Sequence, residues 1–198
     1  MKRTDRLTNQ NLFITTLTGC YLLLCAWQPV WGEEEPVDLK TVSVLGIKPA
    51  EFNIPKIREH LWNIGGFMQA RSTVRQRNVD KFFAWSRIRD SYYLQVRYNH
   101  VGNVTSIKRL YRPYSTEHSN RRTPISTKEV AIKLIEQAGQ PSRILRKGRG
   151  GTLSYSSFEW EDDNIEIVVD REGSEKLGNV FIEYVVKNES PYAIAQLE

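Results

Sequence analysis

Residues 126–141 read STKEVAIKLIEQAGQP, and residues 53–66 read NIPKIREHLWNIGG. Each stretch opens on a residue whose side chain caps helices, Ser126 or Asn53, and closes on glycine, which accepts the left-handed conformation of a C-cap. Apolar residues recur at every third or fourth position in both stretches, as on the buried face of a helix. Ser126 and Glu129 also match the capping-box pattern. The sequence therefore predicts an amphipathic helix in each stretch.

The two helix signals belong to a longer internal repeat. At an offset of 73 residues Leu61 falls on Leu134, and the pattern Phe-x-Trp at residues 83–85 returns at residues 158–160, at an offset of 75. The triplet Gly-Asn-Val at residues 102–104 returns at 178–180, at an offset of 76. Each helix is thus followed by a Phe-x-Trp strand, a second strand, a turn containing Gly-Asn and a third strand. Gly-Asn is predicted to be a hairpin turn because both residues tolerate the positive φ that such turns need.

This order predicts an α+β protein of two tandem α-β-β-β units, with antiparallel sheets each covered on one face by a helix. The first unit spans residues 44–113 and the second spans residues 126–187. Residues 114–125, rich in Ser, Thr and Arg, form the predicted linker, and residues 188–198 form a C-terminal tail.

The repeat carries a resemblance to known families through residues 134–141, the strand that holds Trp160 and the strand that ends near Val186. A tandem of such units resembles the β-lactamase inhibitory protein family, and a single unit resembles the small lipoprotein of the outer-membrane β-barrel assembly machine. That lipoprotein family usually has a Leu-Gly-x-Pro corner, whereas this chain has Ala-Gly-Gln-Pro at residues 138–141 and Gly-Gly-Phe at residues 65–67. The helix that opens at Ser126 also resembles the PepSY type of exported module. These resemblances imply an exported module that is not built around an enzymatic site.

The N-terminus has the three parts of an export signal. Basic residues near the start precede an apolar stretch, residues 12–27, and a small residue, Gly32, precedes three glutamates. Residues 1–32 are therefore predicted to be a signal peptide, which places the mature protein in the periplasm or outside the cell. An uncleaved N-terminal membrane anchor is the alternative, since the apolar stretch approaches the length that spans a bilayer. Lipidation at Cys20 is another, because Leu-Thr-Gly-Cys at residues 17–20 resembles a bacterial lipoprotein box.

The sequence shows no motif for catalysis, metal binding or a cofactor. Both cysteines, Cys20 and Cys25, lie in the apolar N-terminal stretch, and the three histidines have no zinc-ligand spacing. The chain lacks the Gly-x-Ser-x-Gly and His-Glu-x-x-His patterns. The acidic residues around Trp160, residues 159–163, coincide with a predicted hairpin turn. We therefore expect a non-enzymatic protein without a metal or cofactor.

Charge and aromatic residues suggest where the chain binds. Residues 48–122 hold 15 Lys and Arg against 5 Asp and Glu, a balance of +10, whereas residues 126–198 hold 9 against 13, a balance of −4. Strand alternation turns Leu94, Val96 and Tyr98 toward the helix and leaves Tyr93 and Arg97 on the open face. Residues 104–112 alternate too poorly for their faces to be assigned. The candidate binding residues are Trp85, Arg87, Arg89, Tyr93, Arg97, Lys108, Arg109 and Arg112. As an alternative, Trp85 and Trp160 are equivalent core residues of the two units.

These observations favour an exported cell-envelope module for binding or assembly that acts through protein–protein contacts, since Trp, Tyr and Arg dominate binding hot spots. The first alternative is a polyanion binder that meets lipopolysaccharide, anionic lipid, polysaccharide or nucleic acid through the basic first unit. Export makes nucleic acid the weaker of these partners. The second alternative, a protein inhibitor of a secreted enzyme, follows from the tandem resemblance alone.

Overall fold

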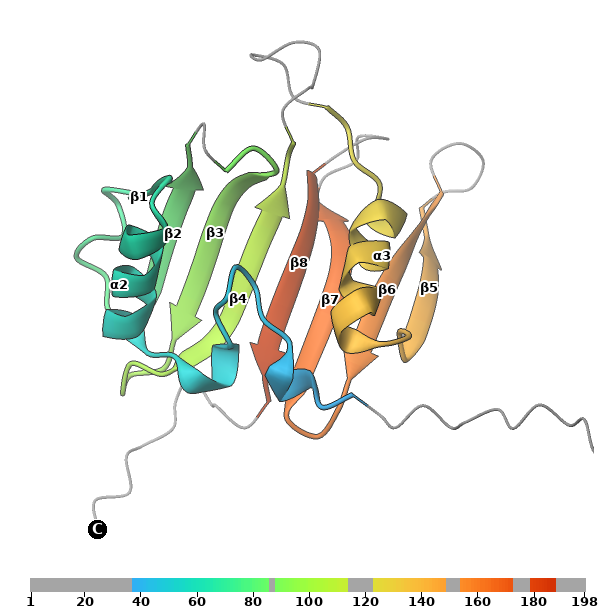
Figure 1. Cartoon of the computed structure of the whole chain (residues 1–198), viewed down its shortest axis with the longest axis horizontal. Coiled ribbons are helices and arrows are strands. Elements are labelled where there is room, and N and C mark those ends of the chain that lie inside the picture. The colour runs from blue at the N-terminus through green and yellow to red at the C-terminus, as the bar shows by residue number, and fades with distance from the viewer. Residues whose placement is uncertain (1–36, 86–87, 114–122, 149–153, 173–178, 188–198) are drawn as a thin grey trace, which may run out of the picture. The chain divides into compact units, whose positions relative to one another are not determined.

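Eight strands form one antiparallel sheet in this computed structural model (Figure 1). The structure describes residues 37–85, 88–113, 123–148, 154–172 and 179–187. The strands lie in the order β1-β2-β3-β4-β8-β7-β6-β5. Their bounds are β1 Phe67–Gln69, β2 Val79–Ala84, β3 Ser91–Tyr98, β4 Val104–Tyr111, β5 Arg143–Lys147, β6 Tyr155–Glu161, β7 Ile165–Glu172 and β8 Asn179–Val186. The α+β class predicted from the sequence is confirmed.

The first helix, α2 (Ile54–Ile64), begins and ends where its sequence predicts. The N–H of Lys56 donates to the side-chain oxygen of Asn53 at 3.2 Å, so the cap satisfies one free donor of the first turn. Gly65 ends the helix with φ at 69°, a value that favours glycine because side chains with a Cβ rarely adopt it. The helix buries Ile57 and Leu61 against the sheet.

The second helix, α3 (Thr127–Ala138), has the predicted capping box. Ser126 Oγ accepts from the N–H of Glu129 at 3.2 Å, and the Glu129 carboxylate accepts from the N–H of Ser126 at 3.2 Å. The helix ends at Gly139, whose carbonyl accepts the indole N–H of Trp160 at 2.8 Å. Figure 1 shows α2 and α3 on the same face of the sheet, with α3 over the second half of the strands.

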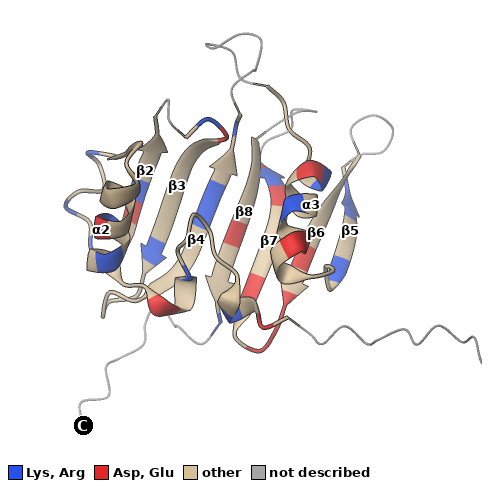
Figure 2. Ribbon diagram, viewed as in Figure 1, with Lys and Arg blue, Asp and Glu red and all other residues tan. Residues whose placement is uncertain are grey.

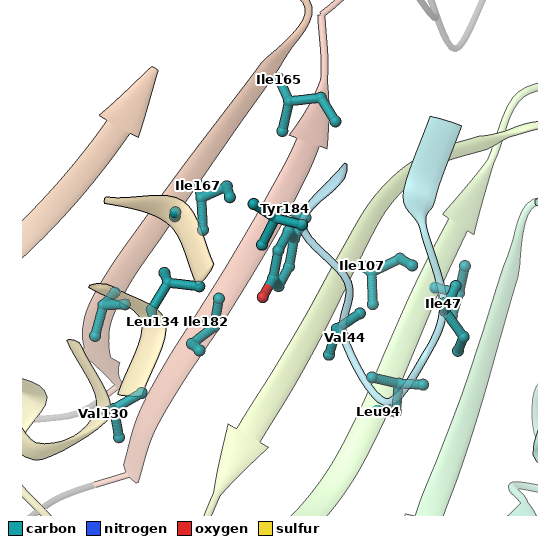
Figure 3. Close-up of a cluster of buried hydrophobic side chains, with 14 of the residues drawn as sticks. Val44, Ile47, Leu94, Ile107, Val130, Leu134, Ile165, Ile167, Ile182 and Tyr184 are labelled. Carbon is teal, nitrogen blue, oxygen red and sulfur yellow. The ribbon is translucent and has the colours of Figure 1, made fainter. Parts of the chain in front are cut away.

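The core lies between these helices and the sheet (Figure 3). Alternate residues of the strands point into it, as their sequence pattern predicts. The buried strand residues include Leu94, Val96, Tyr98, Ile165, Ile167, Val169, Val180, Ile182, Tyr184 and Val186. The strand β4 alternates poorly in sequence because it is a central strand, and seven of its eight residues are buried.

A segment before α2 fills the covered face between the two helices, and the sequence analysis assigned it no such role. It contains two short 3-10 helices, η1 (Leu39–Thr41) and η2 (Pro49–Glu51), and η2 packs on β4 and β8. Between them Val44 and Ile47 exchange backbone hydrogen bonds at 2.9 Å. Both side chains are buried close to Leu94 and Ile107 (Figure 3). The segment therefore closes the core over the centre of the sheet.

The prediction of separate three-stranded sheets is wrong, because four strands follow each helix and all eight join in one sheet. The missed strands, β1 and β5, are the two edges of the sheet and the shortest strands. An edge strand contacts neighbours on one side only, so its sequence carries a weaker burial pattern. Residues 44–113 and 126–187 thus contribute to one layer rather than to two.

The two tryptophans that the sequence analysis compared lie in unlike places. Trp160 is 1% exposed and belongs to the core, whereas Trp85 is 58% exposed. The alternative that both tryptophans are equivalent core residues is therefore wrong, because only Trp160 is buried.

Several sequence predictions lie outside the described residues. These are the signal peptide or anchor at residues 1–32 with Cys20, the side chain of Arg87, most of the linker at residues 114–125 and the tail at residues 188–198.

Candidate functional site

One face of the sheet has no described helix or 3-10 helix on it, and we call it the uncovered face. Residues directly opposite each other in neighbouring antiparallel strands share a face, and successive residues of a strand alternate. Leu94 and Ile107 point into the core, so their neighbours Tyr93 and Lys108 belong to the uncovered face. The register therefore assigns every strand residue to a face.

Five apolar and aromatic residues gather on the uncovered face at the first edge of the sheet: Met68, Phe83, Trp85, Tyr92 and Tyr93. We call them the aromatic patch. Met68 lies opposite Phe83, and Phe83 lies opposite Tyr93. The N–H of Trp85 donates to the carbonyl of Gly66 at 2.7 Å, which continues the pairing of β1 with β2 and keeps Trp85 on the side of Phe83. A register shift between Ser91 and Tyr93 leaves Tyr92 in a bulge.

Three rings of the patch contact one another, and three of its side chains are exposed. The rings of Phe83 and Tyr92 meet edge to face with centroids 6.0 Å apart, and those of Tyr92 and Tyr93 lie 6.1 Å apart. Trp85 is 58%, Met68 51% and Tyr92 36% exposed. Scattered apolar residues are normal on a surface, but a contiguous group of this kind marks a contact site.

Cations lie against the same rings. The ammonium of Lys81 is 4.0 Å from the ring centroid of Tyr93 and 5.4 Å from that of Phe83. The guanidinium of Arg112 is 5.5 Å from the ring of Tyr92. Such cation–π contacts hold the charged groups at the patch, so it combines apolar area with positive charge.

Tyr93 and Lys108 meet at an acidic residue of the other half of the sheet. The hydroxyl of Tyr93 donates to Glu172 at 3.3 Å, and the ammonium of Lys108 forms an ion pair with the same carboxylate. Burial, together with the nearby charge of Glu172, raises the pKa of Tyr93 to about 12. Lys108 also lies 3.8 Å from the ring centroid of Phe181. These two candidate residues therefore have internal partners.

Arg109 lies on the covered face, away from the other candidate residues. It is 8% exposed, and its guanidinium contacts Asp90 at 2.8 Å and the hydroxyl of Ser91 at 2.9 Å. It also stacks over Tyr111, 4.5 Å from the ring centroid. The structure thus separates Arg109 from the other candidate binding residues, and its face could not be assigned from the sequence.

The other candidate arginines in the described residues are exposed. Arg97 lies on the uncovered face, opposite Val79 on one side and Ser106 on the other. Arg89 and Arg112 are exposed at the connection before β3 and at the end of β4. The structure therefore brings Trp85, Tyr93, Arg97 and Lys108 to one face, with Arg112 at its border.

In the second half of the sheet, β6, β7 and β8 carry acidic residues (Figure 2), and several of these pair with bases on the uncovered face. Arg143 pairs with Glu159, Lys147 with Asp170, and Lys187 with Glu161. Burial alone would raise the pKa of Asp170, but the hydrogen bonds it accepts, chiefly from Lys147, hold that pKa below its ordinary value. Glu159 and Glu161 of the acidic run at residues 159–163 therefore pair with bases of their own half.

The acidic turn within this run has a structural use. Asp162 accepts backbone N–H groups of Asn164 and Ile165 in the β6–β7 connection, and its second oxygen accepts the N–H of Leu39 at 3.1 Å. Burial would raise the pKa of Asp162, yet these backbone donors lower it. The turn thus anchors the segment that closes the core.

Comparison of the chain with protein families, curated proteins and solved structures found no match. Within the described residues, no group of three or more His, Cys, Asp or Glu side chains is arranged to hold a metal ion. No helix in the described part of the chain has the length and apolarity needed to cross a membrane.

Sequence reasoning missed a basic loop between β1 and β2, residues 70–78, which we call the arginine loop. Its arginines Arg71, Arg75 and Arg77 are exposed, and Figure 2 shows basic residues along this loop beside α2. Buried Thr73 anchors it, because its hydroxyl donates to the carbonyl of Ala70 at 3.0 Å and accepts the N–H of Lys81 at 3.2 Å.

The loop therefore presents three arginines from a hydrogen-bonded turn. Within the described residues none of these three forms an ion pair. The sequence signal was present, since three arginines within seven residues of turn-forming sequence indicate a basic loop.

Proposed function

We propose that this chain is an exported, non-catalytic binding module of the bacterial cell envelope that docks on a partner protein through the aromatic patch. The observation that carries the proposal is the exposure of Trp85, Met68 and Tyr92 around Phe83 on a sheet face with no described helix over it. Large aromatic side chains contribute most of the energy of protein interfaces, and arginines at the border add hydrogen bonds. The N-terminal export pattern supports the location.

A photo-crosslinking experiment tests the docking surface. We would place a photoreactive phenylalanine analogue at position 85, 68 or 92 in the full-length protein and irradiate intact cells. A discrete adduct with the same protein from all three positions is expected. Trp62 is the matched control, because it is 85% exposed but lies on α2, on the opposite side of the sheet.

The captured protein then has to depend on the patch. With both proteins purified, Trp85→Ala and Met68→Ala should each weaken binding about tenfold, which corresponds to roughly 1.4 kcal/mol. Equal adducts from position 62, or unchanged affinity of both variants, would contradict the proposal. If the captured protein is a secreted enzyme whose activity falls on binding, the module acts as an inhibitor.

The arginine loop favours a second candidate function, the binding of a polyanion. Arginine's planar fork binds phosphate and carboxylate groups in pairs of hydrogen bonds. Of the basic residues that the sequence analysis named, Lys108 and Arg109 have acidic partners, so this proposal rests on Arg71, Arg75 and Arg77 instead.

Heparin, as a model polyanion, tests this second candidate. Replacing the three loop arginines with alanine should lower the salt concentration at which the protein elutes from immobilised heparin. Arg109→Gln, a change on the covered face, should leave elution unchanged if the variant folds. Equal elution of the triple variant and the native chain would exclude the loop as a polyanion site.

We also propose that the chain arose by tandem duplication, with β4 and β8 at the junction. The order of elements supports this, because α2 precedes β1–β4, α3 precedes β5–β8, and the strand order is the same counted inward from either edge. Phe82 and Phe158 pair with Leu94 and Val169, which both point into the core, and this implies an offset of 76. On that offset Trp160 corresponds to Ala84 rather than to Trp85. A one-residue slip reverses the face of a strand, so the two tryptophans point to opposite sides.

A further inference from the structure

The strand β5 is the second edge of the sheet, and it has the features of a site for strand addition. Among the described strands it pairs with β6 alone, so half of its backbone N–H and C=O groups have no described strand to bond. The opposite edge, β1, has three residues, whereas β5 has five. Short edges are a common protection against pairing, and β5 lacks it.

The side chains of β5 divide between the two faces of the sheet. Arg143 lies opposite Glu159 and Lys147 opposite Tyr155, and both cations belong to the uncovered face, where they pair with Glu159 and Asp170. Ile144 lies opposite Phe158, which packs against the core, so Ile144 and Arg146 belong to the covered face.

On the covered face, β5 extends beyond the helix. The helix α3 packs on β6, β7 and β8, and Figure 1 shows β5 as the outer strand next to it. Ile144 is 58% exposed, and Ile132 of α3 is 51% exposed. Arg146 is also exposed, and no ion pair joins it to another described residue. The edge therefore presents free backbone groups, an exposed isoleucine and an unpaired arginine.

A second copy of the chain fits this edge poorly. Antiparallel pairing of two β5 strands centred on Leu145 would place Arg143 of one copy opposite Lys147 of the other. It would also place Arg146 against Ile144. Like charges directly opposite each other destabilise a strand pair, and neither copy would supply an acid for Arg146. This register of self-pairing is therefore unfavourable.

We propose that β5 binds an extended segment of a partner protein as a ninth, antiparallel strand, with an acidic residue opposite Arg146 and apolar residues opposite Leu145 and Ile144. Backbone hydrogen bonds supply the affinity in this mode of recognition, and the alternate side chains supply the specificity. Because Arg143 and Lys147 already have acidic partners, the residues opposite them need no charge. This surface is separate from the aromatic patch, so the inference stands without the docking function proposed above.

A designed peptide tests the inference directly. Read along its own direction, the antiparallel complement to residues 147–143 is threonine, glutamate, valine, isoleucine, threonine, because threonine and β-branched residues favour strands. The probe is this peptide with two serines at each end and a fluorescein label, titrated with the full chain and followed by anisotropy. We expect saturable binding that Arg146→Glu and Ile144→Asp each weaken at least tenfold.

The controls separate strand addition from simple charge attraction. Lys56→Glu makes the same change of charge on α2 and should leave peptide binding unchanged. A peptide with lysine in place of glutamate should bind the Arg146→Glu variant at least tenfold better than the original peptide does. Methylation of alternate peptide nitrogens on the edge that faces β5 should abolish binding, because it removes the donors of the new ladder.

Three results would overturn the proposal. One is the absence of saturable binding to the native chain. Another is full binding by both methylated peptides, one for each set of alternate nitrogens. The third is unchanged affinity in Arg146→Glu and Ile144→Asp, whose exposed side chains can change without unfolding the protein, as circular dichroism would verify.

Discussion

At the scale of single residues, Asp80 is a buried carboxylate in the first half of the sheet that depends on hydrogen-bond partners. It is fully buried and accepts hydrogen bonds from Arg58 at 2.9 and 3.0 Å, from Gln69 at 2.6 Å and from the hydroxyl of Tyr98 at 3.1 Å. A buried carboxylate is tolerated only when such partners replace water. The network therefore fixes the position of α2 against β1 and β2.

Removing Arg58 should destabilise the protein because it leaves the charge of Asp80 buried and uncompensated. We expect Arg58→Ala to lower the free energy of unfolding by about 3 kcal/mol, measured by urea denaturation. Lys48→Ala is the control, since Lys48 and Glu51 form an exposed pair that should contribute less than about 1 kcal/mol. Equal effects of the two substitutions would show that the network is not a stabilising feature.

Buried tyrosines should make the fold sensitive to alkali. Burial is the main cause that raises the pKa of Tyr184 above its ordinary value of 10.0, with a smaller contribution from Tyr111. The unfolded chain therefore releases the proton at a lower pH than the folded chain, and stability falls as pH rises above about 10.

Tyr184→Phe tests this alkaline effect. The slope of unfolding free energy against pH between 10 and 11 should become shallower in the variant, by up to about 1.4 kcal/mol per pH unit. At pH 7 both forms are protonated and the ionisation difference vanishes. An unchanged slope in the variant would assign the alkaline loss to other groups, such as Tyr93.

At the scale of elements, each helix is held by a few buried aliphatic residues rather than by its length. Leu61 of α2 is 1% exposed and Leu134 of α3 is 4% exposed, and both belong to the same hydrophobic cluster. Helices of 11 and 12 residues are marginal alone in water, so their stability depends on this packing.

Leu61→Ala and Leu134→Ala should each lower the free energy of unfolding by roughly 2–5 kcal/mol, because each leaves a cavity under a helix. Ile132→Ala, an exposed position of α3, should change it by less than about 0.5 kcal/mol. Thermal or urea denaturation of the purified variants measures both. A small change in unfolding free energy for Leu134→Ala would mean that neighbouring side chains fill the cavity left by the substitution.

At the scale of the whole molecule, the halves share one sheet through six residue pairs between β4 and β8. The central segment with Val44 and Ile47 belongs to the same buried cluster as residues of both helices. Because the two halves share a sheet and a core, they should unfold together.

We therefore expect one cooperative unfolding transition, in which Leu61→Ala and Leu134→Ala shift the same midpoint. Tryptophan fluorescence and far-ultraviolet circular dichroism should give coincident curves. Two separate transitions, each sensitive to one substitution, would show that the halves fold as independent domains.

At this scale we also predict that the protein is exported and that its N-terminal signal is removed. Mass spectrometry of protein from its native host should find a mature N-terminus after Gly32, as the export pattern predicts. An intact Met1 would favour a retained anchor, and a lipid-modified N-terminal Cys20 would favour the lipoprotein alternative.

Part of the fold and of the candidate site could be predicted from residue patterns. Alternation correctly placed Leu94 and Val96 in the core, and the caps correctly located both helices. The same alternation in β3 placed Tyr93 on the uncovered face, but the sequence did not reveal its contacts with Glu172, 79 residues away. The face of Arg109 could not be assigned from the sequence, because its strand is buried on both sides and gives no clear period.

The sequence by itself determined the local features of this protein: two capped helices, alternating strands and an uneven charge distribution. These depend on periods of two to four residues and on caps, which neighbouring residues alone define. Only the tertiary structure decided that the strands form one sheet and that Trp160 is buried while Trp85 is exposed. It also decided that β5 is an edge strand and that Glu159, Glu161 and Asp170 pair with bases. Strand order and register are set by contacts between residues far apart in the chain, and a shift of one residue reverses which face meets the solvent.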